Sequence, residues 1–115
     1  MLNPAASRIF VAVEPVDLRL GLDGLCARAQ HGLALNPFGG DWVIFRNKAG
    51  NRLKLLGFDG TGFWLCYRRL ERGRWVWPKA GEQVMTLSYP QFLLLVQGQD
   101  WRRVQVPEKF QPSLI

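Results

Sequence analysis

Basic side chains gather in one stretch of this chain, from Arg46 to Lys79, and they are the groups with the clearest chemistry. The stretch contains nine Lys and Arg residues but only two acidic residues, Asp59 and Glu71, so its net charge is +7, whereas the whole 115-residue chain carries +6. It also contains six aromatic residues. Arginine makes planar, forked contacts with phosphate, and aromatic rings stack on bases. This combination indicates a nucleic acid as the first partner to consider.

The candidate nucleic-acid contacts are eight of these basic residues and one indole ring. Two alternatives are a solvated sheet face without a ligand and a surface for an acidic protein partner. Against a solvated face, the stretch lacks the acidic residues that would balance it. Tryptophans at alternate strand positions usually pack in a core, and we expect this of Trp64 and Trp77 more than of Trp75. The candidates are Arg46, Lys48, Arg52, Lys54, Arg68, Arg69, Arg72, Arg74 and Trp75.

Aspartates offer the best route to catalysis, because metal-dependent nucleases and transposases hold Mg²⁺ with two or three carboxylates. Local structure explains them more simply. Asp17 fits a helix cap, and Asp23 fits an ion pair with Arg19 one turn away. Asp41 and Asp59 fit turns. We therefore expect no enzymatic activity, no metal and no cofactor.

The two cysteines, Cys26 and Cys66, lie forty residues apart without a CxxC pattern, and the chain has one histidine. This arrangement argues against a zinc site. We expect two reduced, buried thiols, with a disulfide as the alternative. The longest apolar run, residues 92–96, is too short to span a bilayer, and the first residues do not form a secretion signal. The expected location is the cytoplasm, with no membrane partner and no small-molecule substrate.

Alternation of polar and apolar residues predicts a β-hairpin over residues 42–48 and 52–56, with a tight turn at 49–51. The two faces of this hairpin would differ in character, because successive strand residues point to opposite sides. The apolar face would comprise Val43, Phe45, Leu53 and Leu55. The basic face would comprise Arg46, Lys48, Arg52 and Lys54.

Further strands are predicted at residues 8–13, 63–70 and 74–77, where β-branched and aromatic residues are frequent. An amphipathic helix is predicted from near Asp17 to near Gly32. A second helix is predicted from Ser88 to Val96, because Ser88 with Gln91 forms a capping-box pattern.

The predicted fold class is α+β: an antiparallel, mostly meander β-sheet with two helices packed on one face. Four successive strands over residues 42–77 indicate the meander. We expect a single domain over residues 1–115, because this length can bury a core of its own. Its ordered core would span about 8–101, and its C-terminal tail, 102–115, would be extended or frayed.

A set of linked motifs runs through the chain from Arg8 to about Trp101. In the basic stretch they are Arg46-Asn47, Arg52-Leu53-Lys54-Leu55-Leu56, Asp59-Gly60-Thr61-Gly62-Phe63, Tyr67-Arg68-Arg69-Leu70-Glu71-Arg72-Gly73 and Trp77-Pro78. Outside it they are Arg8-Ile9-Phe10, Pro15-Val16-Asp17-Leu18-Arg19, Gly21, Asp23-Gly24-Leu25, Asn36-Pro37-Phe38 and Asp100-Trp101. Together they resemble the small accessory protein, often called TnpB or Orf2, of insertion sequences of the IS66 class.

The resemblance implies a bacterial mobile-element protein that is encoded beside a larger DDE-type transposase and is required for efficient transposition. The family is not known for catalysis of its own. We therefore expect a non-catalytic accessory protein of DNA transposition. Through the basic sheet face it would bind DNA, at element ends or non-specifically, or the transposase of the same element, or both. The alternative is a protein-interaction module that docks the transposase without contacting DNA.

Overall fold

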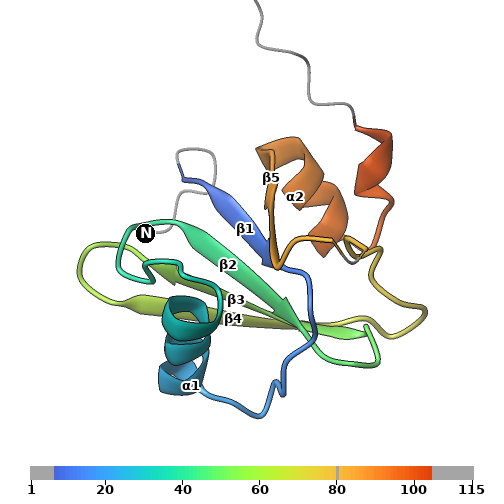
Figure 1. Cartoon of the computed structure of the whole chain (residues 1–115). Coiled ribbons are helices and arrows are strands. Elements are labelled where there is room, and N and C mark those ends of the chain that lie inside the picture. The colour runs from blue at the N-terminus through green and yellow to red at the C-terminus, as the bar shows by residue number, and fades with distance from the viewer. Residues whose placement is uncertain (1–6, 80, 105–115) are drawn as a thin grey trace, which may run out of the picture.

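The central element of the fold is a five-stranded β-sheet (Figure 1), seen in a computed structural model that describes residues 7–79 and 81–104. The strands lie in the order β4-β3-β2-β1-β5. Their bounds are Ile9–Ala12 (β1), Trp42–Arg46 (β2), Arg52–Phe58 (β3), Phe63–Arg69 (β4) and Val84–Leu87 (β5).

The sheet is mixed, so the prediction of a purely antiparallel sheet is wrong, although the α+β class is right. β1 and β2 run parallel, with Ile9 opposite Trp42 and Val11 opposite Ile44, and the other three strand pairs are antiparallel. Only β2, β3 and β4 form a meander. Parallel neighbours need a crossover connection. Residues 13–41, which contain the helix α1 (Leu22–Ala27), supply it.

Helices cover both faces of the sheet, so the prediction that both helices pack on one face is wrong. α1 continues into the π-helix η1 (Arg28–Gly32), and together they pack Leu25 and Ala29 against Phe45 on what we call the α1 face. α2 (Tyr89–Val96) packs Phe92 and Leu95 on the opposite side, the α2 face (Figure 1). The first four residues of β2 are all buried. Strands that are apolar without interruption are typical of sheets covered on both sides.

The register of the β2–β3 hairpin divides the predicted basic face between the two sides of the sheet. Phe45 lies opposite Lys54, and Arg46 lies opposite Leu53. Residues opposite each other in an antiparallel pair share a face. Arg52 and Lys54 therefore lie on the α1 face, and Arg46 lies on the α2 face. The prediction that they share one face is wrong.

A single asparagine side chain organises the turn that sets this register. The Oδ1 atom of Asn47 accepts hydrogen bonds from the backbone N–H groups of Asn51 at 3.1 Å and Arg52 at 3.0 Å. Its Nδ2 donates to Asn51 Oδ1 at 2.7 Å. Gly50 adopts a positive φ of 75°, a region that favours glycine. The turn occupies residues 48–51 rather than 49–51, and one extra residue moves each later side chain to the other face.

α1 begins later than predicted, and Asp17 does not cap it. The N-cap is Gly21, which offers no side-chain hydrogen bond. Asp17 instead closes a separate turn: its carboxylate accepts the Arg19 N–H at 2.9 Å, and its carbonyl accepts the Leu20 N–H at 3.1 Å. Because Arg19 is ion-paired to Asp17, the expected pair between Arg19 and Asp23 is wrong as well.

The predicted strand at residues 74–77 is not part of the sheet. The segment lies against the α2 face, where Trp75 is 5% exposed. The Trp77 indole N–H donates to the carbonyl of Ala12 at 2.8 Å, and the Trp101 indole N–H donates to the carbonyl of Val76. Side-chain bonds thus replace the strand ladder. The fifth strand of the sheet is instead β5, which pairs with β1 at the end of the sheet opposite β4.

The predicted second helix is confirmed as α2. Ser88 and Gln91 form both bonds of the capping box, and Gly98 adopts a φ of 78° after the helix. The predicted tail begins inside a short 3₁₀-helix, η2 (Trp101–Arg103), and residues 105–115 lie outside the described part. No helix among the described residues is long and apolar enough to cross a membrane.

The burial of both sheet faces leads to a testable prediction about two adjacent residues of β2. Ile44 and Phe45 point to opposite faces and are both 0% exposed. We expect Ile44→Ala to cost about 2 to 5 kcal/mol and Phe45→Ala about 3 to 5 kcal/mol of the free energy of unfolding. Chemical denaturation measures both. The exposed Thr86→Ala serves as a control with a change within about 0.5 kcal/mol. A small effect at either core position would contradict the two-sided sheet.

Candidate nucleic-acid interface

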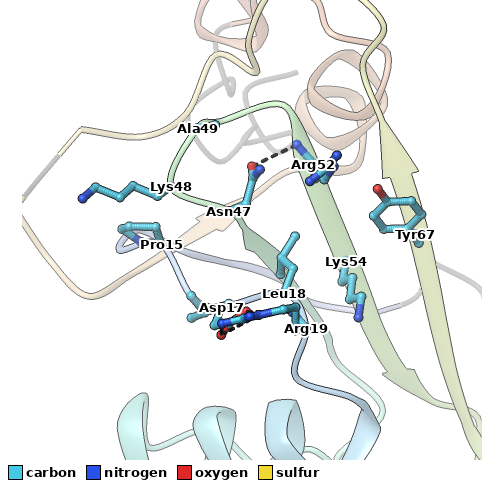
Figure 2. A pocket seen from close by; sticks show the side chains of 11 residues that line it. Pro15, Asp17, Leu18, Arg19, Asn47, Lys48, Ala49, Arg52, Lys54 and Tyr67 are labelled. Carbon is cyan, nitrogen blue, oxygen red and sulfur yellow. Dashed lines mark hydrogen bonds and ion pairs between the residues drawn. The ribbon is translucent and has the colours of Figure 1, made fainter.

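Three of the candidate residues meet in a groove on the α1 face, beside the β2–β3 turn. The groove has a volume of about 750 Å³ and is bounded by the 15–19 segment, the turn and the exposed ends of β3 and β4. Lys48, Arg52 and Lys54 line it, together with Arg19 and Tyr67 (Figure 2). Asp17 is the one acidic residue of the lining. We call this surface the basic groove.

The sheet register sets the spacing of charge at the groove. Arg52 on β3 lies directly opposite Arg69 on β4, and Lys54 lies opposite Tyr67. Like charges directly opposite each other destabilise a sheet. Glu71 offsets one of them, since it pairs with Arg69 at 3.0 Å at the surface. A bound anion would relieve the remaining repulsion.

The cations of the groove differ in how firmly they are held. Lys54 donates from Nζ to the carbonyl of Leu20 at 3.0 Å, which ties β3 to the crossover segment. Among the described residues, no acidic side chain is ion-paired with Lys48 or Arg52, and both are exposed. These two side chains are therefore available to an external anion.

Arg19 belongs to the groove, although it is not among the predicted contacts. It lies outside the basic stretch and forms a bidentate ion pair with Asp17, in which Nη2 lies 2.8 Å from Oδ2. Hydrogen bonds from Arg19 lower the pKa of Asp17 from 3.8 to about 2. The neighbouring Asp-Leu-Arg pattern was the available signal, but only the fold brings it beside β3.

Four of the remaining candidates have other surroundings. Arg46 is half-buried; its guanidinium donates to the carbonyl of Val13 and lies over the Trp77 ring. Arg68 faces away from the groove, because Leu53, its partner on β3, lies on the α2 face. Arg72 and Arg74 are exposed in the loop after β4.

The burial of Trp64 and Trp75 is the reverse of what the sequence predicts. Trp75, chosen as a stacking candidate, is buried in the core and cannot reach a base. Trp64, expected in the core, is 44% exposed on β4. Its indole N–H donates to Asp59 Oδ2 at 2.8 Å. Trp77 is partly buried against the core, as expected.

The carboxylates hold local structure. Asp59 accepts from the N–H groups of Thr61 and Gly62 and from Trp64, and these bonds hold its pKa far below its usual range. Asp41 is ion-paired with Arg8 at 2.8 Å. Within residues 7–79 and 81–104, no group of three or more His, Cys, Asp or Glu residues is placed to hold a metal ion.

Both cysteines are free thiols. Cys26 is half-buried, and burial raises the pKa of its thiol. Cys66 is exposed on β4, so the expectation that both are buried is wrong for this residue. Alternation within β4 places it on the α2 side of the sheet, away from the groove.

Comparison with known proteins identifies the family. The family model described as "IS66 Orf2 like protein" matches residues 7–106. This chain belongs to the IS66 Orf2-like family. The predicted resemblance is confirmed. Membership connects the chain with insertion sequences and transposition, because the family is described by its likeness to Orf2 of IS66.

Two relatives come from Sinorhizobium fredii. "Uncharacterized protein y4hO" is 38% identical over 108 residues, which cover 94% of this chain and 92% of the relative. "Uncharacterized protein y4jC" is 39% identical over 106 residues, 91% of each chain. Their names state no activity. No solved structure matches this chain.

The ion pair beside the groove gives a prediction about titration. We expect NMR to place the midpoint of Asp17 near pH 2 and to move it toward 3.8 in Arg19→Gln. A depressed pKa means that the pair stabilises the fold at neutral pH, and that this contribution disappears as the pH falls through about 2. An unchanged midpoint in the variant would mean that Arg19 does not pair with Asp17.

Proposed function

We propose that this protein is a non-catalytic accessory factor of DNA transposition that binds the DNA phosphate backbone in the basic groove. The groove is the single observation that carries the proposal. Two of its exposed cations have no acidic partner within the described part of the chain, and its one carboxylate, Asp17, is already paired with Arg19. Family membership supports the link to transposition.

Phosphate binding fits the chemistry of the groove. Arg52 presents a forked donor and Lys48 a flexible point charge, and together they can follow successive phosphates along a strand. Tyr67 is 55% exposed and adds a hydroxyl donor and a ring that can stack on a base or sugar. None of these contacts reads the edge of a base pair, so we expect binding with weak dependence on sequence.

The proposed setting is the cytoplasm, where the protein would act beside the transposase of the same element. The position of DNA in the groove leaves the α2 side of the sheet open to that larger protein. The alternative, docking of the transposase without any DNA contact, predicts no salt-dependent binding to unrelated duplexes.

The central prediction concerns the two groove cations that are available to an anion. We expect Lys48→Gln with Arg52→Gln to weaken duplex binding at least about tenfold, because two charge-assisted phosphate contacts are lost. The slope of log affinity against log salt should fall by about 1.8, or about 0.9 for each contact. Fluorescence anisotropy at several salt concentrations measures both quantities.

A control variant that loses the same charge elsewhere distinguishes binding in the groove from a general attraction between the basic protein and DNA. Arg28→Gln with Arg103→Gln removes two exposed positive charges outside the groove and should change affinity much less. Arg72→Gln with Arg74→Gln, in the loop after β4, should have an intermediate effect. Equal losses in all three pairs, at unchanged melting temperature, would reject the groove as the site. Full affinity in the groove variant would show that DNA binds elsewhere on the protein, whereas no salt-dependent DNA binding by the unmodified protein would favour the protein-docking alternative.

A further prediction is that the purified protein neither cleaves nor joins DNA when Mg²⁺ or Mn²⁺ is added. The reason is that Asp17, Asp41 and Asp59 are engaged in turns and ion pairs. Incubation with supercoiled plasmid and with element-end DNA tests this. Metal-dependent cleavage that is lost in Asp59→Asn or Asp23→Asn would contradict the prediction.

A further inference from the structure

The outer edge of β4 pairs with no strand among the residues that the structure describes. β4 lies at the end of the sheet and pairs on one side only, with β3. It is seven residues long, and five of the seven are exposed. Proteins usually shield such an edge with proline, with charged side chains, with a bulge or by shortening the strand. β4 has no proline and no bulge, since each of its residues pairs with one residue of β3, and its two charged residues, Arg68 and Arg69, lie at one end. By contrast β5, at the other end, has four residues.

The hydrogen-bonding pattern shows which residues present backbone groups at this edge. The β3–β4 ladder is bounded by bonds from Asp59 N–H to Gly62 O and from Leu70 N–H to Asn51 O. Bonded and non-bonded pairs alternate in an antiparallel ladder. Residues 64, 66 and 68 therefore direct their N–H and C=O groups toward β3. Residues 63, 65, 67 and 69 direct theirs outward.

We propose that a second copy of this chain occupies this edge, with the two β4 strands antiparallel and Cys66 on the two-fold axis. Residues whose backbone groups point outward must then pair with each other across the two copies. In this register Leu65 lies opposite Tyr67 of the other copy, and Phe63 lies opposite Arg69. It engages all seven residues of β4. A shift of the axis to a neighbouring residue leaves residues at the ends of the strand without partners.

Charge and ring placement favour a second copy in this register. Arg68 lies opposite Trp64 of the other copy, and Arg69 lies opposite Phe63, so each arginine meets an aromatic ring rather than another arginine. Arginine over an aromatic ring is attractive. Centring the axis on Arg68 would instead place two guanidinium groups face to face, which is destabilising. The aromatic start and the basic end of β4 thus make the strand complementary to itself.

The dimer would also extend the DNA surface, a consequence that rests on the proposed function. Residues opposite each other across an antiparallel pair share a face. The two-fold axis therefore runs perpendicular to the sheet, and both α1 faces point to the same side. Two basic grooves would flank one seam, and one duplex could contact both.

The test measures mass and cross-linking of the full chain without DNA, so its result is independent of DNA binding. We expect analytical ultracentrifugation to give a concentration-dependent mass approaching twice 13.1 kDa. Cys26→Ser leaves Cys66 as the only thiol, and mild oxidation should link two chains through it. Opposite residues in a non-bonded pair lie about 4.5 Å apart between Cα atoms, within the range that a disulfide spans.

A matched pair of substitutions at the axis completes the experiment. Cys66→Arg sets two like charges against each other and should weaken dimerisation at least about tenfold. Cys66→Thr is neutral and should keep the dimer. Because Cys66 is exposed, both variants should fold, and circular dichroism verifies this. A monomer at every concentration, or a dimer equally stable in Cys66→Arg, would overturn the proposal. Loss of DNA binding with an intact dimer would reject the proposed function alone.

Discussion

The hydrogen bonds of the Asn47 carboxamide are the constraint on which the surface of this protein depends. They fix a turn of four residues, and the turn fixes which side chain of β2 lies opposite which side chain of β3. A shift of the strand pairing by one residue moves every later side chain to the opposite face of the sheet. The turn therefore places Arg52 and Lys54 in the groove and sends Arg46 to the other side of the sheet.

Burial of both sheet faces limits where charge can be exposed. The apolar residues of β1 and β2 are covered by α1 on one side and by α2 with the 74–77 segment on the other. Exposed charged side chains therefore lie at the β2–β3 turn and on β3 and β4. The basic groove and the free β4 edge share this origin. Both lie on the part of the sheet that extends beyond the helices and the 74–77 segment.

The family relationship and the groove support the functional proposal in different ways. Similarity over residues 7–106 connects the chain with IS66 elements but names no ligand. The groove supplies a chemical reason for DNA as the ligand, since its available cations match the charge of a phosphate backbone. The π-helical continuation of α1 packs Ala29 into the core, and neither it nor α2 contributes a side chain to the groove lining.

The sequence by itself determined the α+β class, the family, the capping box of α2 and the concentration of positive charge at residues 46–79. These features depend on residue type and local spacing, which a sequence displays directly. Only the tertiary structure decided which charges act together. The crossover segment places Arg19 in the same groove as Arg52 and Lys54 of β3. Trp75 enters the core because the 74–77 segment packs on the α2 face. The physical reason is that strand partners and facing sides follow from contacts between distant residues, and alternation within one strand fits either register equally well.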